Sequence, residues 1–330
     1  IYYAYILSKK IQKLYGKEYF KLVYSHHETM DCIYLAYFLS NFLKIKRAAL
    51  LCLPPFYKNR RILNIRIQSY DFTYPRNNLK RIVKKINLIL IWKIKETILK
   101  ILLSQFHLII AVSTAIVEEM NEKWEKRIKI LNPNTSYRHV KKGEGEEGKE
   151  EYKYDALFYA RLIPEKGIFD IPIIWRKVVA KIPEAKIAIA GKFQKNEVKS
   201  TFFKLINRLS LNKNVIYIGW KTREEIGKLL ERSKIVIYPS YLDAIPAVVI
   251  ESLAYNKLVI AYNIPAIRHN FPIREVIKIE VGNYDEMAEK VIDVLRKGKY
   301  RVEVPLKFLE KFKSWDKVVE SEIAILKKLL

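Results

Sequence analysis

From residue 154 onward, short apolar runs alternate with longer segments whose apolar residues recur every three or four positions. The short runs have the length of buried strands, and the longer segments have the period of helices that bury one face. We expect strands at 155–160, 185–191, 214–219, 234–240 and 257–262, and helices at 167–182, 197–210, 222–233 and 247–256. Strands that alternate with helices form parallel sheets with helices on both faces. This part of the chain therefore predicts an α/β domain.

Two helix ends in this part carry signals of their own. Thr222-x-x-Glu225 has the spacing of a capping box, in which each side chain bonds the backbone of the other residue. Asn256 follows the last helix, at a place where a left-handed residue commonly ends a helix. Both signals support the predicted boundaries.

The same alternation is weaker before residue 138. We expect strands at 20–27, 47–54 and 106–113, and helices at 2–16, 30–43, 79–103 and 114–124. These elements predict a second Rossmann-like domain. We expect it to lack its first strands, because the numbering starts at Ile1 rather than at a methionine.

A polar, charged and glycine-containing segment at 138–155 separates the two parts and is typical of a linker. The predicted organisation is a first domain at 1–140, a linker at 141–153, a second domain at 154–305 and a terminal segment at 306–330. The terminal segment contains a helix that we expect to pack back toward the first domain. A Gly-x-Gly-x-x-Gly sequence at 143–148 is not a dinucleotide fingerprint, because no strand precedes it and its glutamates would repel a pyrophosphate.

The net charge of +26 is concentrated in the first part of the chain. Residues 1–140 contain 25 Lys/Arg against 9 Asp/Glu, a net charge of +16. An excess of this kind favours an anionic partner: nucleic acid, a membrane surface or a phosphorylated substrate. Solubility or a general lysine bias is the alternative explanation. Cys32 and Cys52 are too few for a disulfide framework, and no cluster has metal-ligand spacing.

Charged residues follow two of the predicted strands of the second domain. Arg161 and Lys166 follow the strand at 155–160, where the two cations could bind a diphosphate or simply be solvated. Asp243 follows the strand at 234–240, and Glu251 lies in the next helix. The two carboxylates could hold the hydroxyls of a sugar nucleotide, or Asp243 could be a helix cap. In open α/β sheets ligands bind outside the carboxyl ends of the strands, so these residues lie where a ligand is expected, and both explanations of each pair stay open at this point.

In the first domain, His27 lies at the end of the strand at 20–27. A histidine there could act as a base or donate to a hydroxyl or phosphate, although a lone histidine is more often structural.

Four segments together resemble the family 4 glycosyltransferases of the GT-B fold. They are YARLIPEKG (159–167), AKIAIAGKF (185–193), NVIYIGW (214–220) and YPSYLDAIPAVVIESLAYNKLVIAY (238–262). The resemblance covers about 20–330 and is strong over 154–265. It implies an α/β GT-B fold, in which two Rossmann-like domains with parallel sheets face each other across a cleft. The first would receive the acceptor and the second the nucleotide sugar.

The resemblance also implies a reaction and a set of residues. The reaction is a retaining, metal-independent hexosyl transfer from a UDP- or GDP-sugar, which needs no cofactor. In this arrangement Arg161 and Lys166 contact the donor diphosphate, and Glu251 holds the ribose hydroxyls. Asp243 lies against the transferred sugar, and His27 faces the donor sugar and the acceptor. The catalytic residues would be His27, Asp243, Arg161 and Lys166, and the donor-binding residues Arg161, Lys166, Gly191, Gly219, Trp220, Asp243, Ala247, Val248 and Glu251.

Two departures from the family pattern keep other functions open. Asp243 is shorter than the usual glutamate, and Pro246 offers no N–H to a ligand. A catalytically weakened binding or scaffold subunit is therefore one alternative. A nucleic-acid-binding protein is another, motivated by charge alone and without a recognition motif; we expect no nucleic-acid partner.

The segment at 58–100 suggests where the acceptor is. Between Arg76 and Lys100 it holds eight Lys/Arg against one acid, Glu96, with apolar residues among them. It is either a core helix with solvated lysines or a basic amphipathic helix that binds an anionic membrane. The second possibility suits a lipid-linked glycan as acceptor. It also suits a cytoplasmic protein peripheral to the inner face of the cell membrane.

Overall fold

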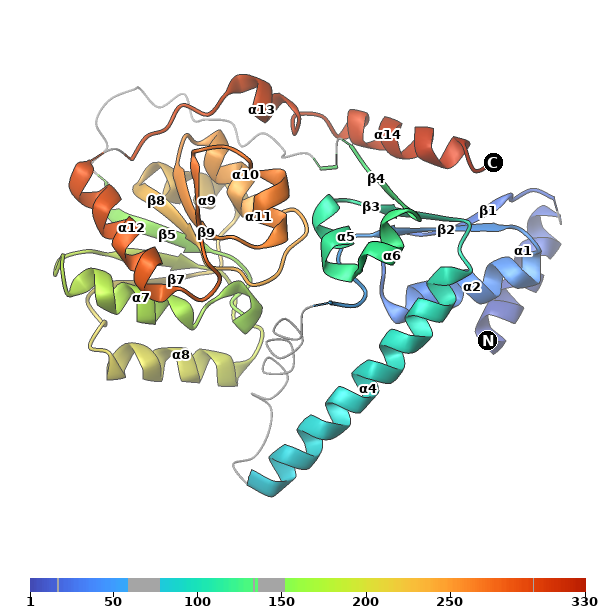
Figure 1. The fold of residues 1–330 in the computed structure, drawn as a ribbon, viewed down its shortest axis with the longest axis horizontal. Helices are drawn as coiled ribbons and strands as arrows, with labels where there is room; N and C mark the ends of the chain where they lie inside the picture. The colour runs from blue at the N-terminus through green and yellow to red at the C-terminus, as the bar shows by residue number, and fades with distance from the viewer. Residues whose placement is uncertain (17, 59–77, 133, 136–151, 299) are drawn as a thin grey trace. The chain divides into compact units, whose positions relative to one another are not determined.

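The computed structural model describes residues 1–16, 18–58, 78–132, 134–135, 152–298 and 300–330. The predicted linker through residue 151, the Gly-x-Gly sequence at 143–148 and residues 59–77 of the basic segment lie outside this part. The chain forms two compact units (Figure 1). Unit 1 comprises Ile1–Leu63, Pro75–Ser136 and Ser314–Leu330, and unit 2 comprises Asn64–Tyr74 and Tyr137–Lys313.

The described part of unit 2 contains a six-stranded sheet in the order β10-β9-β8-β5-β6-β7, and every pair of neighbouring strands is parallel. The strands are β5 (Tyr154–Tyr159), β6 (Ile187–Ala190), β7 (Val215–Gly219), β8 (Ser233–Tyr238), β9 (Leu258–Tyr262) and β10 (Val276–Ile279). This is the Rossmann order, in which the chain builds one half of the sheet outward and then returns to build the other half.

Helices cover both faces of this sheet. They are α7 (Asp170–Val179), α8 (Asn196–Arg208), α9 (Arg223–Glu231), α10 (Ala247–Ala254), α11 (Pro265–Asn270), α12 (Tyr284–Lys297) and α13 (Leu306–Glu310), with a 3₁₀ turn η1 at Pro164–Lys166. Figure 1 shows α7, α8 and α12 on one face and α9, α10 and α11 on the other. Because both faces are covered, β6 and β9 are buried along their whole length, which explains their continuous apolar runs.

The described part of unit 1 contains a four-stranded parallel sheet in the order β1-β2-β3-β4. Its strands are β1 (Leu22–Ser25), β2 (Lys46–Leu51), β3 (Leu108–Ala111) and β4 (Ile128–Ile130). Its helices are α1 (Tyr2–Tyr15), α2 (Met30–Leu43), α4 (Asn78–Ser104), α5 (Thr114–Met120), α6 (Glu122–Glu125) and α14 (Trp315–Lys327). The predicted α/β class with two parallel sheets is therefore confirmed.

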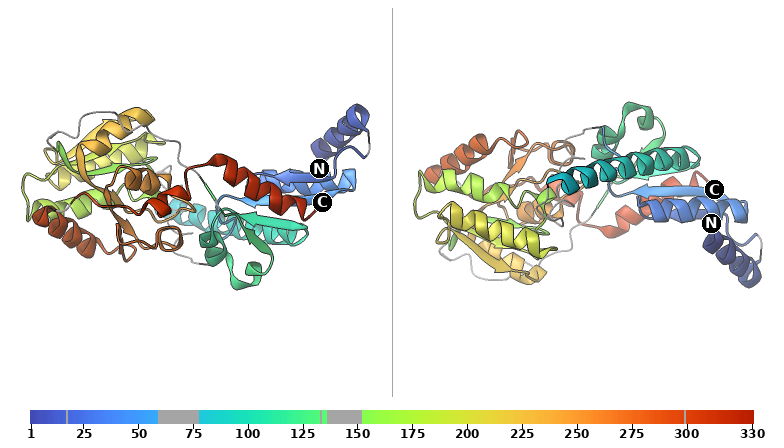
Figure 2. Two further views of the ribbon diagram at one scale, coloured as in Figure 1. Left: turned by 90° about the horizontal axis from the view of Figure 1, so that it is seen from above. Right: turned by 90° about the horizontal axis from the view of Figure 1, so that it is seen from below.

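The last helix of the chain, α14, packs on the sheet of unit 1 (Figures 1 and 2). Val318 joins Leu50, Ile110 and Leu131 in one buried cluster. Leu50 and Ile110 are register partners in β2 and β3, so their side chains project from the same face of the sheet. Without α14, these apolar side chains would face water.

One predicted helix is wrong in detail. The segment at 114–124 forms two helices, α5 and α6, because Asn121 has a φ of 155° that no helix accommodates. Its side chain accepts a hydrogen bond from Lys123 N at 3.3 Å and so begins α6. The predicted capping box of α9 and the left-handed Asn256 are both confirmed.

Candidate functional site

The strand order of unit 2 creates a switch point between β5 and β8. From β5 the chain moves to β6 on one side, and after β7 it returns to β8 on the other side. The loops that leave such a pair of strands diverge, and the space between them is the usual ligand site of this fold. Here the loops are residues 160–167 and 239–246, which carry three of the predicted site residues, Arg161, Lys166 and Asp243.

These two loops are fastened to each other. Tyr241 N donates to Glu165 O at 2.9 Å. Gly167 has a φ of 76°, and a Cβ added to it would lie 2.1 Å from Pro239 O. Only glycine fits this position, both because of its left-handed backbone and because of the close neighbour. The loops therefore form one wall of the site.

Within this wall, Lys166 and Asp243 form an ion pair. Lys166 Nζ lies 2.6 Å from Asp243 Oδ2 and also donates to Leu242 O at 3.0 Å. The Tyr238 hydroxyl donates to the same carboxylate oxygen, and Ala244 N donates to the other at 3.0 Å. Burial beside this carboxylate raises the pKa of Tyr238 well above its usual value, which keeps the phenol protonated as a donor. The side chain of Asp243 is therefore held by three donors.

Glu251 lies in the second turn of α10, with its carboxylate mostly buried. The Tyr159 hydroxyl lies 3.4 Å from Glu251 Oε2 and donates at 2.8 Å to Val248 O. Arg223 Nε lies 3.9 Å from Glu251 Oε1. Burial raises the pKa of Glu251 above its ordinary 4.5, although the charge of Arg223 acts against this shift. A partly desolvated carboxylate with few close donors has remaining capacity to accept from ligand hydroxyls.

The start of α10 offers backbone donors. Pro246 precedes the helix and no side chain caps it. The N–H groups of Ala247 and Val248 belong to the first turn, which has no partner within the helix. The first turn of a helix favours an anion through these groups and through the helix dipole.

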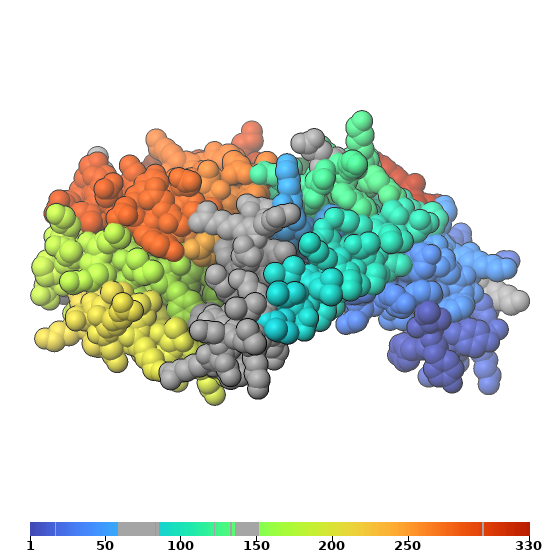
Figure 3. Space-filling view, turned by 60° about the horizontal axis from the view of Figure 1, so that its bottom comes forward, coloured from blue at the N-terminus to red at the C-terminus, as the bar shows by residue number. Residues whose placement is uncertain are grey.

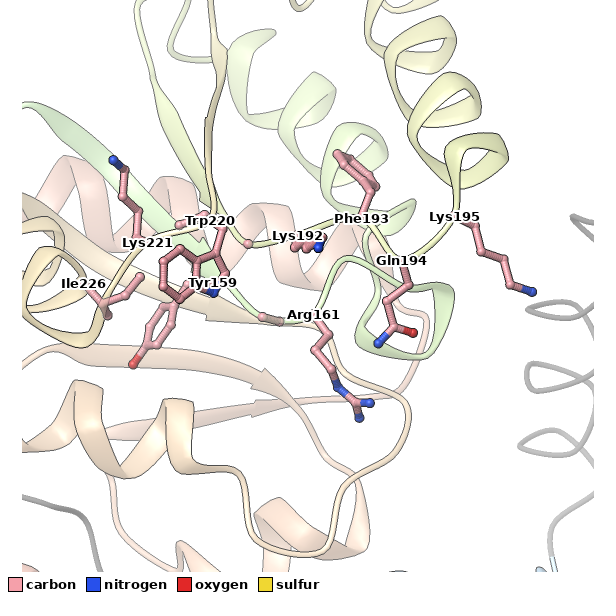
Figure 4. A pocket seen from close by; sticks show the side chains of 12 residues that line it. Tyr159, Arg161, Lys192, Phe193, Gln194, Lys195, Trp220, Lys221 and Ile226 are labelled. Atoms are coloured by element: carbon pink, nitrogen blue, oxygen red, sulfur yellow. The ribbon is translucent and has the colours of Figure 1, made fainter.

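A pocket of about 770 Å³ opens at the carboxyl ends of β5, β6 and β7 (Figure 4). It is lined by Tyr159, Ala160, Arg161, Ala190, Gly191, Lys192, Phe193, Gln194, Lys195, Trp220, Lys221 and Ile226. The lining contains four cations and no carboxylate among the described residues. Its Trp220 side chain is 66% exposed, so the flat ring is accessible to a ligand in the pocket. The pocket is thus suited to an anionic ligand that has a flat ring.

A buried acid supports the wall from behind. Asp170, at the start of α7, accepts from the Tyr241 hydroxyl at 2.6 Å and from the Tyr262 hydroxyl at 2.8 Å. Burial next to Asp170 raises the pKa of both tyrosines, so that both remain donors. The loop after β8 is in this way tied to α7 and to β9.

The predicted residues of unit 2 gather around the switch point. The pocket contains Arg161, Gly191 and Trp220, and Gly219 O accepts from Gly191 N at 2.8 Å. Ala247, Val248 and Glu251 lie together in α10. Lys166 and Asp243 also lie together, because they form an ion pair.

His27 lies in unit 1 and is described there by itself. Its Nδ1 lies 3.4 Å from Glu28 Oε1, and its ring is half-exposed. The other oxygen of Glu28 accepts from Cys52 N at 2.9 Å, and Ser25 Oγ donates to His27 O at 2.9 Å. These bonds hold the histidine at the carboxyl ends of β1 and β2, and its catalytic role stays a prediction.

The sequence analysis missed several residues of the site. They are Tyr159 and Tyr238, which contact the two carboxylates, Asp170, and the pocket lysines Lys192, Lys195 and Lys221. Tyr159 and Tyr238 close their strands, and that position at the carboxyl end of a strand was a usable signal.

Among the described residues, no group of three or more His, Cys, Asp or Glu side chains is placed to hold a metal ion. None of the described helices combines the length and the hydropathy that crossing a lipid bilayer requires.

Comparison with solved structures supports the fold. Sucrose-phosphate synthase from Thermosynechococcus elongatus matches 98% of this chain and 77% of its own, with a TM-score of 0.66 and 13% identity. Anabaena HepE in complex with UDP-glucose matches 98% of this chain and 81% of its own, with a TM-score of 0.63 and 14% identity. A third structure is a TarM variant from S. aureus in complex with UDP, Fondaparinux and alpha-GlcNAc-glycerol. The match covers 96% of this chain but only 57% of the TarM chain, with a TM-score of 0.63 and 18% identity.

At these identities the similarity establishes the fold, which is the GT-B fold of glycosyltransferases with its two parallel sheets. No curated protein sequence matches the chain. Residues 141–305, half of the chain, match the family described as "Glycosyl transferases group 1". These residues include the pocket, the fastened loops and α10, and the chain therefore belongs to the group 1 glycosyltransferases.

Proposed function

We propose that the chain transfers a hexosyl group from a nucleoside diphosphate sugar to an acceptor, as family 4 enzymes do. The configuration of the sugar is retained, and no metal ion takes part. One observation carries this proposal: the loop after β5 carries Arg161 into a cationic pocket of about 770 Å³ and also carries Lys166, which pairs with Asp243, while the pocket residue Tyr159 contacts Glu251. The cations suit a diphosphate, and the carboxylates suit the hydroxyls of a ribose and a sugar.

Each part of the donor has residues that suit it. Trp220 offers an exposed ring for the base, and Glu251 offers a carboxylate for the ribose hydroxyls. Arg161 offers a guanidinium that can bind a phosphate in a bidentate manner. Asp243, held by Lys166, is assigned to the hydroxyls of the transferred sugar. His27 is assigned to the acceptor side.

The chemistry asked of the protein is mainly electrostatic. The bond between the anomeric carbon and the β-phosphate oxygen breaks, and a new bond forms from the same carbon to an acceptor oxygen. The acceptor proton is released, and negative charge develops on the departing diphosphate. Fixed cations that meet this charge stabilise the transition state, usually through the largest single contribution to catalysis. The proposal covers retention by a front-side route and by a covalent route alike.

A panel of UDP-, GDP- and ADP-sugars tests the proposal. A ligand that binds only the folded state raises the melting temperature, so the correct donor is expected to stand out in thermal-shift assays. HepE and TarM were solved with UDP or UDP-glucose, which makes the uridine nucleotides the first choice. The anomeric configuration of the product is then read by NMR. Activity that is lost in EDTA and restored by Mg²⁺ would contradict the metal-independent mechanism.

We further propose that the acceptor is linked to a lipid and that α4 binds an anionic membrane surface, which places the protein at the inner face of the cell membrane. Val83, Ile86, Leu90 and Ile94 are exposed and recur every three or four residues, so they form one apolar stripe. Lys93 and Lys95 are exposed beside it. Figure 3 shows α4 on the molecular surface. An apolar stripe flanked by lysines suits the interface of an anionic bilayer.

Flotation with liposomes that contain an anionic lipid tests this surface. The double variant Lys93→Gln/Lys95→Gln is expected to bind about tenfold or more weakly, because each lysine near anionic lipid contributes roughly 1 kcal/mol. Lys123→Gln/Lys129→Gln, in the same unit but outside α4, is the matched control. Binding must also weaken as salt rises. Equal binding by the two double variants would remove α4 as the docking surface. The side chains of Lys80, Arg81, Lys84 and Lys85 lie outside the described residues.

A further inference from the structure

Tyr238 ends β8 at the switch point, with its ring inside unit 2 and its hydroxyl at the loop that follows the strand. Only 1% of the residue is exposed. β8 is an inner strand, paired with β5 on one side and with β9 on the other. A ring enclosed by close packing keeps one orientation, so the position of the hydroxyl is fixed before a ligand arrives.

The hydroxyl of Tyr238 gives its proton to Asp243. It donates to Asp243 Oδ2, the same oxygen that lies 2.6 Å from Lys166 Nζ. Lys166 Nζ also lies 3.4 Å from the Tyr238 oxygen, to which it can donate. A phenol can donate and accept at once, so the three groups form one network. The carboxylate of Asp243 is therefore held from a rigid strand as well as by a flexible side chain.

The neighbouring tyrosine, Tyr159, is bonded differently. The register of β5 and β8 places Tyr159 beside Tyr238. The Tyr159 hydroxyl makes its shortest contact with a backbone carbonyl, Val248 O at 2.8 Å, and lies 3.4 Å from Glu251 Oε2. A phenol has a single proton to donate. Of the two carboxylates at the site, Asp243 is thus the one that a buried tyrosine holds directly.

Lys166 by itself would be an uncertain support for Asp243. It lies on the same loop as Arg161, which lines the cationic pocket. A diphosphate bound there would compete with Asp243 for the ammonium group, because the lysine side chain is flexible and the diphosphate carries more negative charge. The enclosed ring of Tyr238 cannot follow the ligand in this way. When Lys166 turns to a diphosphate, Asp243 keeps the hydroxyl of Tyr238 and the N–H of Ala244 at 3.0 Å.

We propose that Tyr238 is a positioning residue, which holds the carboxylate of Asp243 for the hydroxyls of the transferred sugar while Lys166 contacts the donor diphosphate. This inference rests on the proposed function, because it assigns a residue to the same donor site. Tyr238 acts through Asp243 rather than on the nucleotide. Its loss is therefore felt by the sugar and not by the rest of the donor.

Calorimetric titration of Tyr238→Phe with the preferred sugar nucleotide, and with the nucleoside diphosphate that lacks the sugar, tests this role. Affinity for the sugar nucleotide should fall about tenfold or more, as the loss of a hydrogen bond to a charged group does. Affinity for the nucleoside diphosphate should stay the same, which also shows that the site is folded. Tyr300→Phe is the matched control and should change neither affinity. Its hydroxyl donates to Leu295 O at 2.9 Å, and its ring lies beside Lys234 at the opposite end of β8.

A double-mutant cycle shows whether Tyr238 acts through Asp243. In the Asp243→Asn background, Tyr238→Phe should cause little further loss of affinity for the sugar nucleotide, because the carboxylate that it holds is already gone. Losses that add in full would mean that the tyrosine acts by another route, and the inference would be wrong.

The remaining outcomes separate this inference from the proposed function. If the wild type and Tyr238→Phe bind the sugar nucleotide equally well, the inference is overturned while the proposed function stands. An equal loss of affinity for the nucleoside diphosphate would also overturn it, because Tyr238 would then support the whole site rather than the place of the sugar. If the wild type binds no sugar nucleotide, the proposed function fails and this inference fails with it.

Discussion

Replacing Gly167 with alanine should separate the two loops that form the wall of the site. Gly167 ends the 3₁₀ turn after β5 with a φ of 76°, and its α-carbon faces the backbone of Pro239 after β8. The new methyl group would lie 2.1 Å from Pro239 O and 2.9 Å from Pro239 C. Because these are backbone atoms, no side-chain rotation can relieve the overlap.

The expected cost has two parts, and Gly219 isolates one of them. An alanine held in the left-handed region costs about 1–2 kcal/mol. Gly219 has a similar φ of 85° but no atom within 4 Å of an added Cβ, so Gly219→Ala should incur only this part. Gly167→Ala must in addition move the backbone by more than 1 Å, and overpacking of this kind costs about 1–3 kcal/mol. The total for Gly167→Ala is therefore about 2–5 kcal/mol.

Thermal unfolding of the two variants measures this difference. For a unit of this size, 1 kcal/mol corresponds to about 2–4 °C. Gly167→Ala should therefore melt about 2–12 °C below Gly219→Ala. Donor affinity should fall as well, since Arg161 lies on the displaced loop. Equal melting temperatures for the two variants would refute the steric argument and leave only the backbone conformation as the cause.

Three further predictions concern the candidate site. Arg161→Ala should lower kcat/KM by the equivalent of about 2–4 kcal/mol. The variant should still fold, since Arg161 is exposed on a loop, and near-normal turnover would contradict its phosphate role. Glu251→Gln should weaken donor binding by about 1.5–3 kcal/mol, a larger loss than Asp243→Glu causes. If calorimetry gives the reverse order of the two losses, the two roles are exchanged. The ionised form of Glu251 accepts the ribose hydroxyls, and burial raises its pKa above 4.5. Affinity for a sugar nucleotide should therefore decline on acidification at a higher pH than an ordinary glutamate would cause, and Glu251→Gln should abolish that decline.

Elements with local signals could be predicted closely from the sequence. The strand expected at 234–240 lies at Ser233–Tyr238, and the helix expected at 247–256 lies at Ala247–Ala254. The capping box at Thr222 and the left-handed Asn256 form because each depends on residues within about four positions. By contrast, β4 has three residues with one buried, and the sequence analysis assigned no strand there. A strand that short exists only because β3 pairs with it.

The site shows the same division between local and long-range information. Arg161, Asp243 and Glu251 could be found because each follows a recognisable strand. The contacts that these carboxylates make could not be found, because Lys166 meets Asp243 across 77 positions and Tyr159 meets Glu251 across 92. Such contacts depend on which strands are neighbours in the sheet, and no spacing in the sequence encodes that order. Lys192 was missed for the same reason, since its place in the same pocket as Arg161 follows from β5 and β6 being neighbours in the sheet.

The place of α14 has a consequence for how the protein is made. Val318 completes a cluster with Leu131, but it is synthesised 187 residues later, after the whole of residues 137–313. At ribosomal speeds this interval is roughly 10–40 s. During that time the side of the first sheet on which α14 packs lacks that helix, while residues 137–313, which are continuous in the sequence, can already fold. Tyr24, at the start of the chain, also waits for its hydrogen-bond partner Glu322. Nascent chains that stop before residue 314 should therefore bind chaperones through the earlier unit, and addition of the last seventeen residues should release them.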